Sequence, residues 1–256
     1  MAIAKHVHPE MVEPYDAAKD GARASEWPGF LPHAIAEQYD KVRSSLLTYR
    51  TLEAINEPER AHQLELARLN VIHHMGMLSH FVGDAAQPLH TTKHHHGWVG
   101  ENPAGYTKDY GFHSYIDTAI VELHEFTYAS LRPGMTYSRT VTPANPWTDT
   151  LDHIRRSNQK VEPLYIMERD GTLKRDAGKA FISERLIDGA ETLAALYKAA
   201  WESSGPTEQD ILSFLKFNNL RSELLPASAH PAPSGPPPAG AASPIGAPAT
   251  TPAPAK

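Results

Sequence analysis

Apolar residues recur at intervals of three and four along most of the chain, which is the spacing that buries one face of an α-helix. The pattern predicts a helix over residues 32–54 and a longer one over 59–81, whose more apolar second half indicates a central position. Residues 56–58, Asn-Glu-Pro, interrupt the pattern, and this proline suits the first turn of the second helix. Gly83 and Pro88 are predicted to end that helix.

The same spacing resumes after a long connection over residues 85–110. It predicts further helices over about 111–126, 148–167, 176–203 and 208–220, with an irregular segment at 132–147. No stretch shows the sustained two-residue alternation of a half-buried strand, and the sequence contains no internal repeat. The predicted fold class is all-α, a compact multi-helix domain.

Composition divides the chain into three parts. Residues 1–30 are rich in Pro, Gly and charged residues and are predicted to form an irregular arm. The all-α domain is expected to span residues 31–225. Residues 226–256 consist almost entirely of Pro, Ala, Gly, Ser and Thr, so they cannot bury enough apolar surface to offset their ordering entropy. This last part is predicted to be a disordered tail.

Charge and composition exclude several classes of function. The formal net charge is −6 and there is no run of Lys and Arg, which argues against a protein that reads duplex DNA by neutralising phosphates. The chain has no Cys, so disulfides and thiolate chemistry are excluded. No apolar run reaches membrane-spanning length, and no signal peptide is visible at the N-terminus. The charge and composition remain compatible with an enzyme that binds phosphate through metal ions.

Histidine and aspartate cluster in the middle of the chain. Two segments, HFVGDAAQPLH and GFHSYID, contain candidate metal ligands at His80, Asp84, His90, His113 and Asp117. The pairs His80/Asp84 and His113/Asp117 are four residues apart, so each pair shares one face of a helix. A charged Asp84 at the end of an apolar helix would be costly unless it is paired or bound to a metal.

This ligand chemistry favours zinc in a catalytic role, with Mn²⁺ or Fe as alternatives. The two His/Asp pairs and His90 together offer five ligands, which is more than one tetrahedral site can hold. More than one metal is therefore expected. Clustered metals serve the hydrolysis of phosphoryl and carboxyl esters. We expect the remaining histidines to be core or surface residues, namely His62, His73, His74, His124, His153 and His230. The run His94–His96 is expected to form a solvated loop.

The two segments resemble the signature of the zinc-dependent phospholipase C and single-strand nuclease superfamily, of the nuclease S-one/P-one type. The likeness covers about residues 30–205 and rests on the order and spacing of His, Asp, Gln-Pro-Leu-His and a distal His with an acidic residue four later. The resemblance implies an all-α fold with up to three zinc ions and a metal-bound water that cleaves phosphodiester or phospholipid bonds. It implies that His80 and Asp84 bind a first zinc, with Asp84 a bridging carboxylate beside the zinc-bound water. A separate zinc would be held by His90, His113 and Asp117, so at least one zinc is expected.

The N-terminal part departs from the family pattern. The family's N-terminal Trp, a nearby His and a first-site Asp have no counterpart, and only His6 or His8 could match the His that precedes the central helices. His6 fits better because Val7 follows it. Ala86 stands where many members have a further His. Family members are secreted or periplasmic, so a start placed too far downstream would account for both the missing ligands and the missing signal peptide. A relative with a reduced site is the alternative.

The sequence therefore predicts a zinc-dependent phosphodiester hydrolase that resembles single-strand-preferring nucleases of the endonuclease and 3′-nucleotidase type. Its substrate would be single-stranded nucleic acid or a nucleotide, with base stacking on Trp98, Tyr106 or Tyr110, unless these rings pack on their own domain. A phospholipase C-like hydrolase acting on a phospholipid headgroup is the first alternative. A non-catalytic helical protein with an incomplete site is the second.

Overall fold

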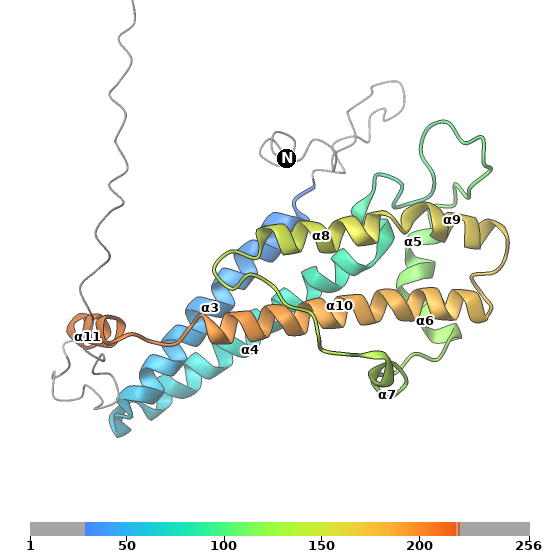
Figure 1. The fold of residues 1–256 in the computed structure, drawn as a ribbon. Helices are drawn as coiled ribbons and strands as arrows, with labels where there is room; N and C mark the ends of the chain where they lie inside the picture. The colour runs from blue at the N-terminus through green and yellow to red at the C-terminus, as the bar shows by residue number, and fades with distance from the viewer. Residues whose placement is uncertain (1–28, 219, 221–256) are drawn as a thin grey trace, which may run out of the picture.

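Three long helices run side by side through the molecule (Figure 1): α3 Leu31–Ile55, α4 Ala61–Ala86 and α10 Asp176–Glu202. The computed structural model describes residues 29–218 and 220, and these residues include no strand. Apolar residues of the three helices bury one another in a first core cluster that includes Ile35, Tyr39, Val42, Leu78, Val82, Ala85 and Leu196. The predicted all-α, compact fold is confirmed.

The turn between α3 and α4 follows the predicted break. Asn56 caps α3 with a left-handed φ of 50°, and the 3₁₀ turn η3, Pro58–Arg60, leads into α4. α4 then continues through Gly83 to Ala86, so the prediction that Gly83 helps to end this helix was wrong. Glycine inside a helix costs about 1 kcal/mol. Burial of apolar residues around it, Val82 and Ala85 among them, offsets that cost.

A second core cluster lies beyond the end of α4. It gathers the 3₁₀ turn η4 Pro88–Thr91, the short helices α5 Phe112–Ser114 and α6 Ile120–Leu123, the π-helical turn η5 Tyr115–Ala119, and α9 Val161–Arg169. Its buried members include Leu89, Tyr106, Phe112, Ile116, Ile120, Leu164 and Tyr165. The predicted helix over 111–126 is therefore present but divided, with a π-helical turn at its centre.

The predicted helix over 148–167 is two helices, α8 Trp147–Asn158 and α9. Pro163 explains the break, because it has no N–H to donate to the Gln159 carbonyl and its ring clashes with that group in a continuous helix. The segment predicted to be irregular begins with a 3₁₀ turn, η6 Arg132–Gly134, which follows the short helix α7 Tyr128–Leu131.

The last helix, α11 Glu208–Phe217, begins at a capping box formed by Thr207 and Asp210. It packs against the end of α3 through a small third cluster around Ile55, Ile211 and Leu215. Within the described residues, no helix has both the length and the apolar character needed to cross a membrane. Residues 1–28 of the predicted arm over 1–30 and the predicted tail lie outside the described residues.

Candidate metal centre

The end of α4 brings the first candidate ligands into place. Gln87 leaves the helical conformation (φ −82°, ψ 120°), and its side chain accepts a hydrogen bond from the backbone N–H of Leu89. Pro88 opens η4, whose Leu89 side chain is completely buried in the second core cluster. Because Leu89 is anchored in this way, the adjacent His90 is held at a fixed position between α4 and the α5 region.

The opposing ligands come from α5 and the π-helical turn that follows it. His113 lies in α5, and Asp117 lies in the turn Tyr115–Ala119. The two side chains meet as their spacing predicted, with His113 Nε2 2.9 Å from Asp117 Oδ2. Single π-helical turns within helices occur frequently at functional sites. The four-residue spacing alone did not reveal this turn.

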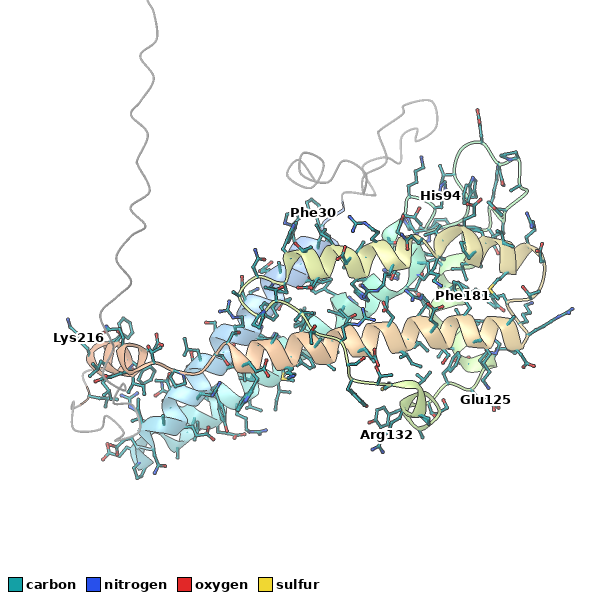
Figure 2. All side chains as sticks on the ribbon, viewed as in Figure 1. Phe30, His94, Glu125, Arg132, Phe181 and Lys216 are labelled. Carbon is teal, nitrogen blue, oxygen red and sulfur yellow. The ribbon has the colours of Figure 1, made fainter. Side chains whose placement is uncertain are left out.

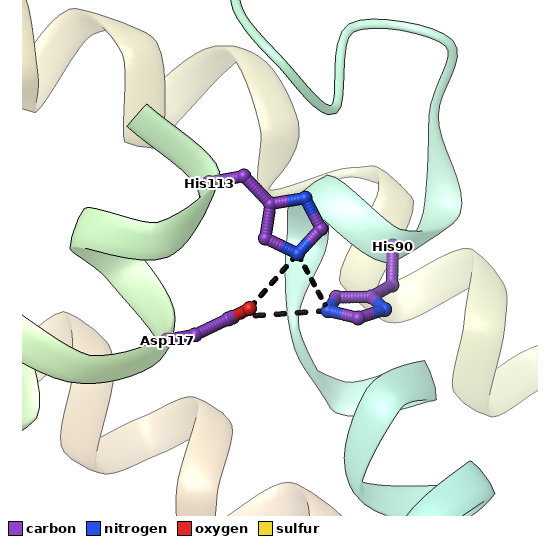
Figure 3. A group of neighbouring side chains, drawn as sticks. All are labelled: His90, His113 and Asp117. Atoms are coloured by element: carbon purple, nitrogen blue, oxygen red, sulfur yellow. Dashed lines mark hydrogen bonds and ion pairs between the residues drawn. The ribbon is translucent and has the colours of Figure 1, made fainter. Parts of the chain in front are cut away.

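Three ligand atoms from these elements converge (Figure 3). The Nε2 atoms of His90 and His113 are 3.0 Å apart, and His90 Nε2 lies 3.7 Å from Asp117 Oδ1. Ligand atoms bound at about 2.0–2.1 Å in a tetrahedral zinc site are separated by about 3.3 Å. Among the described residues, His90, His113 and Asp117 form the one group whose geometry could hold a metal ion. We refer to these three residues as the ligand triad.

Neighbouring polar groups orient part of the ligand triad. Gln87 Nε2 donates a hydrogen bond to Asp117 Oδ1 at 2.9 Å, and Asp84 Oδ1 lies 3.9 Å from His90 Nδ1. Such outer partners fix the orientation of metal ligands. His113 differs, because its Nδ1 atom is buried and makes no hydrogen bond with any of the described residues.

The groups around Asp117 and His90 shift the pKa values of these two triad members. Burial disfavours the charged form of Asp117, but hydrogen bonds from His113, His90 and Gln87 outweigh it and hold the pKa of this carboxyl well below its usual range. Burial also opposes the charging of His90, yet its hydrogen bond to Asp117 and the negative charge of Asp84 raise its pKa. Since a metal binds the neutral imidazole, the raised pKa of His90 means that a metal at this site would compete with a proton.

Two other predicted ligands, His80 and Asp84, form a pair that lies outside the ligand triad. His80 Nε2 is 3.4 Å from Asp84 Oδ2, so this pair does share a helix face as predicted. The His80 side chain is 64% exposed, and neither residue joins the ligand triad. The predicted ligands His6 and His8 lie outside the described residues.

The histidine-rich loop differs from its predicted role. His94 is buried rather than solvated, with its ring stacked on Trp98 at a centroid separation of 3.8 Å. Its Nδ1 accepts a hydrogen bond from the backbone of Val99, and its carbonyl accepts one from the Tyr165 hydroxyl. Figure 2 places His94 at the end of the molecule opposite Lys216. The buried ring therefore ties His94 to Val99, while the residue's backbone carbonyl ties the loop to Tyr165.

The aromatic residues proposed for base stacking divide into two groups. Tyr106 is buried, and Trp98 packs on it with ring centroids 4.6 Å apart, so both belong to the core of their own loop. Tyr110 is 63% exposed and stacks on His96 at 4.1 Å. The His96 ring lies 5.0 Å from that of His113, so this stacked pair borders the ligand triad.

A buried charged cluster was not predicted from the sequence. Asp188 on α10 lies 2.9 Å from His153 Nδ1, and the guanidinium groups of three arginines surround its carboxylate, namely Arg139, Arg156 and Arg185. We refer to these five residues as the Asp188 cluster. The available signal was the helical spacing of Arg185, Asp188 and Thr192, which places polar residues on the inward face of a largely apolar helix.

The remaining histidines lie where core or surface residues are expected. His124 and His153 are buried, and His124 Nε2 lies 3.0 Å from the Leu173 carbonyl. His62 and His73 are exposed, His74 is half-buried, and His230 lies outside the described residues.

Comparisons with protein-family models, curated proteins and solved structures found no match, so the family resemblance remains a prediction drawn from the motif.

Proposed function

We propose that this chain is a zinc-dependent phosphodiester hydrolase that acts on single-stranded nucleic acid or nucleotides. The observation that carries the proposal is the convergence of His90 Nε2, His113 Nε2 and the Asp117 carboxylate, separated by 2.9–3.7 Å. Two imidazoles and one carboxylate are a typical donor set of catalytic zinc, whose fourth position is left for water or substrate. Zinc held in such a site supplies Lewis acidity that activates water and offsets negative charge on phosphate oxygens.

The residues of the chain have separate tasks in this proposal. Gln87 holds the Asp117 carboxylate in its ligand orientation through the hydrogen bond at 2.9 Å. Asp84 faces His90 Nδ1 and favours the ring orientation in which Nε2 points at the other ligands. His80 and Asp84, 3.4 Å apart, would hold a second metal, which would supply further Lewis acidity beside the ligand triad.

Exposed aromatic surface favours a nucleotide substrate over a phospholipid. Tyr110 is 63% exposed as a residue, and its ring is stacked on His96 beside the ligand triad. A nucleobase placed on such a ring gains about 1–3 kcal/mol of stacking energy, without sequence preference. A phospholipid headgroup offers no planar ring for this contact.

The test begins with the metal content of the purified full chain. We expect bound zinc, its loss on treatment with a chelator, and chelator-sensitive cleavage of single-stranded DNA or RNA. Asp84→Asn should lower both zinc content and cleavage, whereas His73→Ala, an exposed histidine of the same helix, should change neither.

Three outcomes would contradict the proposal. Protein without zinc and without hydrolytic activity would support a non-catalytic helical protein. Cleavage of phosphatidylcholine but not of nucleic acid would assign the site to a phospholipase C-like enzyme. An Asp84→Asn variant that matches the wild type in zinc content and hydrolysis would show that the assignment of this motif to a zinc-dependent hydrolase is wrong.

A further inference from the structure

Helix α8 packs against both α4 and η4, which carry predicted ligands. Two of its side chains reach backbone carbonyls of this part of the chain. His153 Nε2 lies 3.1 Å from the Val82 carbonyl oxygen, and Asn158 Nδ2 donates to the Thr91 carbonyl at 2.9 Å. Because a carbonyl oxygen can only accept, His153 Nε2 is the donor in the first bond. The two bonds bracket residues 82–91.

His153 is itself held in a fixed orientation. The residue is completely buried, and its Nδ1 atom lies 2.9 Å from Asp188 Oδ2. Asp188 is fixed in turn by Arg139 at 2.6 Å and Arg156 at 3.1 Å. The Asp188 cluster therefore sets the position from which His153 contacts α4.

Close packing brings α10 directly against the same turn of α4. A Cβ atom added to Gly189 would lie 2.9 Å from Ala86 Cβ, so the two helices approach here as closely as glycine allows. Asp188 precedes this glycine, and Ala86 is the last residue of α4. The Asp188 cluster is thus anchored beside the end of the helix that it contacts through His153.

The ligand triad is assembled from two separate segments. His90 comes from the bracketed segment, as does Gln87, while His113 and Asp117 come from α5 and η5. The separations that join the two segments, 3.0 Å between His90 Nε2 and His113 Nε2 and 2.9 Å between Gln87 Nε2 and Asp117 Oδ1, depend on where the bracketed segment lies.

We infer that α8 is a brace for the ligand triad, with His153 and Asn158 as positioning residues that hold residues 82–91 in register with His113 and Asp117. Neither residue contacts the ligand atoms, and both act through the backbone of the segment that carries His90. The inference rests on the proposed function, because it assigns the brace to a zinc site. It adds two residues that the ligand motif does not contain.

The experiment measures the zinc affinity of the full chain by competition with a chromophoric chelator. The visible spectrum of the cobalt-substituted protein reports the coordination geometry. His153→Leu removes the donor to Val82, and Asn158→Asp removes the donor to Thr91. We expect each variant to bind zinc about 10- to 100-fold more weakly, as happens when outer partners of metal ligands are lost. His153→Gln keeps an N–H group within reach of Val82 and should recover most of the affinity.

Leu215→Ala supplies the matched control. Leu215 is buried in the third core cluster on α11, so its truncation lowers the Tm without touching the braced segment. Its zinc affinity and cobalt spectrum should equal those of the wild type. His153→Leu and Asn158→Asp should instead change both at a comparable or smaller loss of Tm.

The possible outcomes separate this inference from the proposed function. A wild-type chain that binds no zinc overturns both. If the wild type binds zinc and His153→Leu and Asn158→Asp retain its affinity and spectrum, only the brace is overturned. Should His153→Leu fail to fold, Asn158→Asp decides alone, because Asn158 is exposed at the end of α8 and its loss leaves the buried cluster intact.

Discussion

The molecule contains two His–Asp pairs with the same separation and different surroundings. His113 Nε2 lies 2.9 Å from Asp117, and His153 Nδ1 lies 2.9 Å from Asp188. The side chain of Asp117 is 37% exposed, whereas that of Asp188 is 7% exposed. Three guanidinium groups surround Asp188, while the donors to Asp117 within the described part of the chain are His113, His90 and Gln87.

The difference shows that pairing alone does not identify a functional site. At Asp188 the protein itself supplies the positive charge, so that carboxylate is satisfied by the fold. At Asp117 a second imidazole nitrogen, from His90, points at the same place, and no arginine or lysine of the described residues pairs with the carboxylate. A group of this kind is suited to an added cation, whereas the Asp188 cluster is suited to holding helices together.

The largest effect that distinguishes the pairs is expected from Asp188→Ala. Removal of one partner from a buried ion pair leaves uncompensated charge and costs about 3–5 kcal/mol. Urea unfolding of the variant should show this loss in the free energy of unfolding. The control is Glu65→Ala, whose exposed pair with Arg68 is screened by solvent and should contribute little to stability. A loss as small as that of the control would mean that the Asp188 cluster does not hold the fold together.

His113→Ala tests the pair formed by His113 and Asp117. Loss of one of three converging ligands should weaken zinc binding more than about 100-fold, beyond the usual effect of an outer partner. His80→Ala should leave the affinity of the ligand triad within a few-fold of the wild type, because His80 is 64% exposed and outside the triad. Isothermal titration with zinc measures both. Equal losses in the two variants would show that the five predicted ligands form a single site.

Gly189→Ala probes the close contact beside Asp188. The new Cβ atom would lie 2.9 Å from Ala86 Cβ, so the helices must separate by some tenths of an ångström. Overpacking of this kind costs about 1–3 kcal/mol, reduced by up to about 1 kcal/mol through the better helix propensity of alanine. Gly76→Ala has open space around its Cβ and should instead raise the Tm. A stabilised Gly189→Ala variant would show that the contact is loose.

Lowering the pH should produce the smallest change in the free energy of unfolding. The charges around Asp188 hold its pKa below the usual range in the folded state, although burial opposes this. Its contribution is therefore complete above the unfolded pKa of about 3.9 and is lost as the pH falls towards the folded pKa, by about 1 kcal/mol at pH 3. Urea unfolding of wild type and Asp188→Asn at pH 6 and pH 3 should show a stability difference that shrinks on acidification. A difference that grows instead would mean that the folded pKa is raised.

The helices could be predicted because the spacing of apolar residues indicates which side chains are buried. Residues such as Ile35, Tyr39 and Val42 recur on one face, and the structure buries all three. The division of residues 148–169 could also have been predicted, since Pro163 forbids a continuous helix there. The π-helical turn could not, because α- and π-helical turns place residues four apart on nearly the same face.

Within the candidate site, the sequence identified the ligands but not their supports. Spacing predicted correctly that His113 and Asp117 meet, since α5 and the π-helical turn η5 follow each other without a break. Asp188 and His153 meet only through the tertiary packing of α10 on α8, which no local spacing encodes. His94 was misjudged for a related reason, as its burial depends on Trp98 and on Tyr165 from a distant helix.

The chain changes from one core cluster to the other at Gln87. Val82 and Ala85 belong to the three-helix cluster, whereas Leu89 belongs to the cluster that also contains Phe112 and Ile116. His90 therefore lies just beyond this junction, so a small rotation of the three-helix cluster would reach the ligand triad through residues 82–89. The same rotation would alter the 3.9 Å separation between Asp84 and His90. That separation joins the end of α4 to the second core cluster, so it reports how the two clusters sit relative to each other beside the ligand triad.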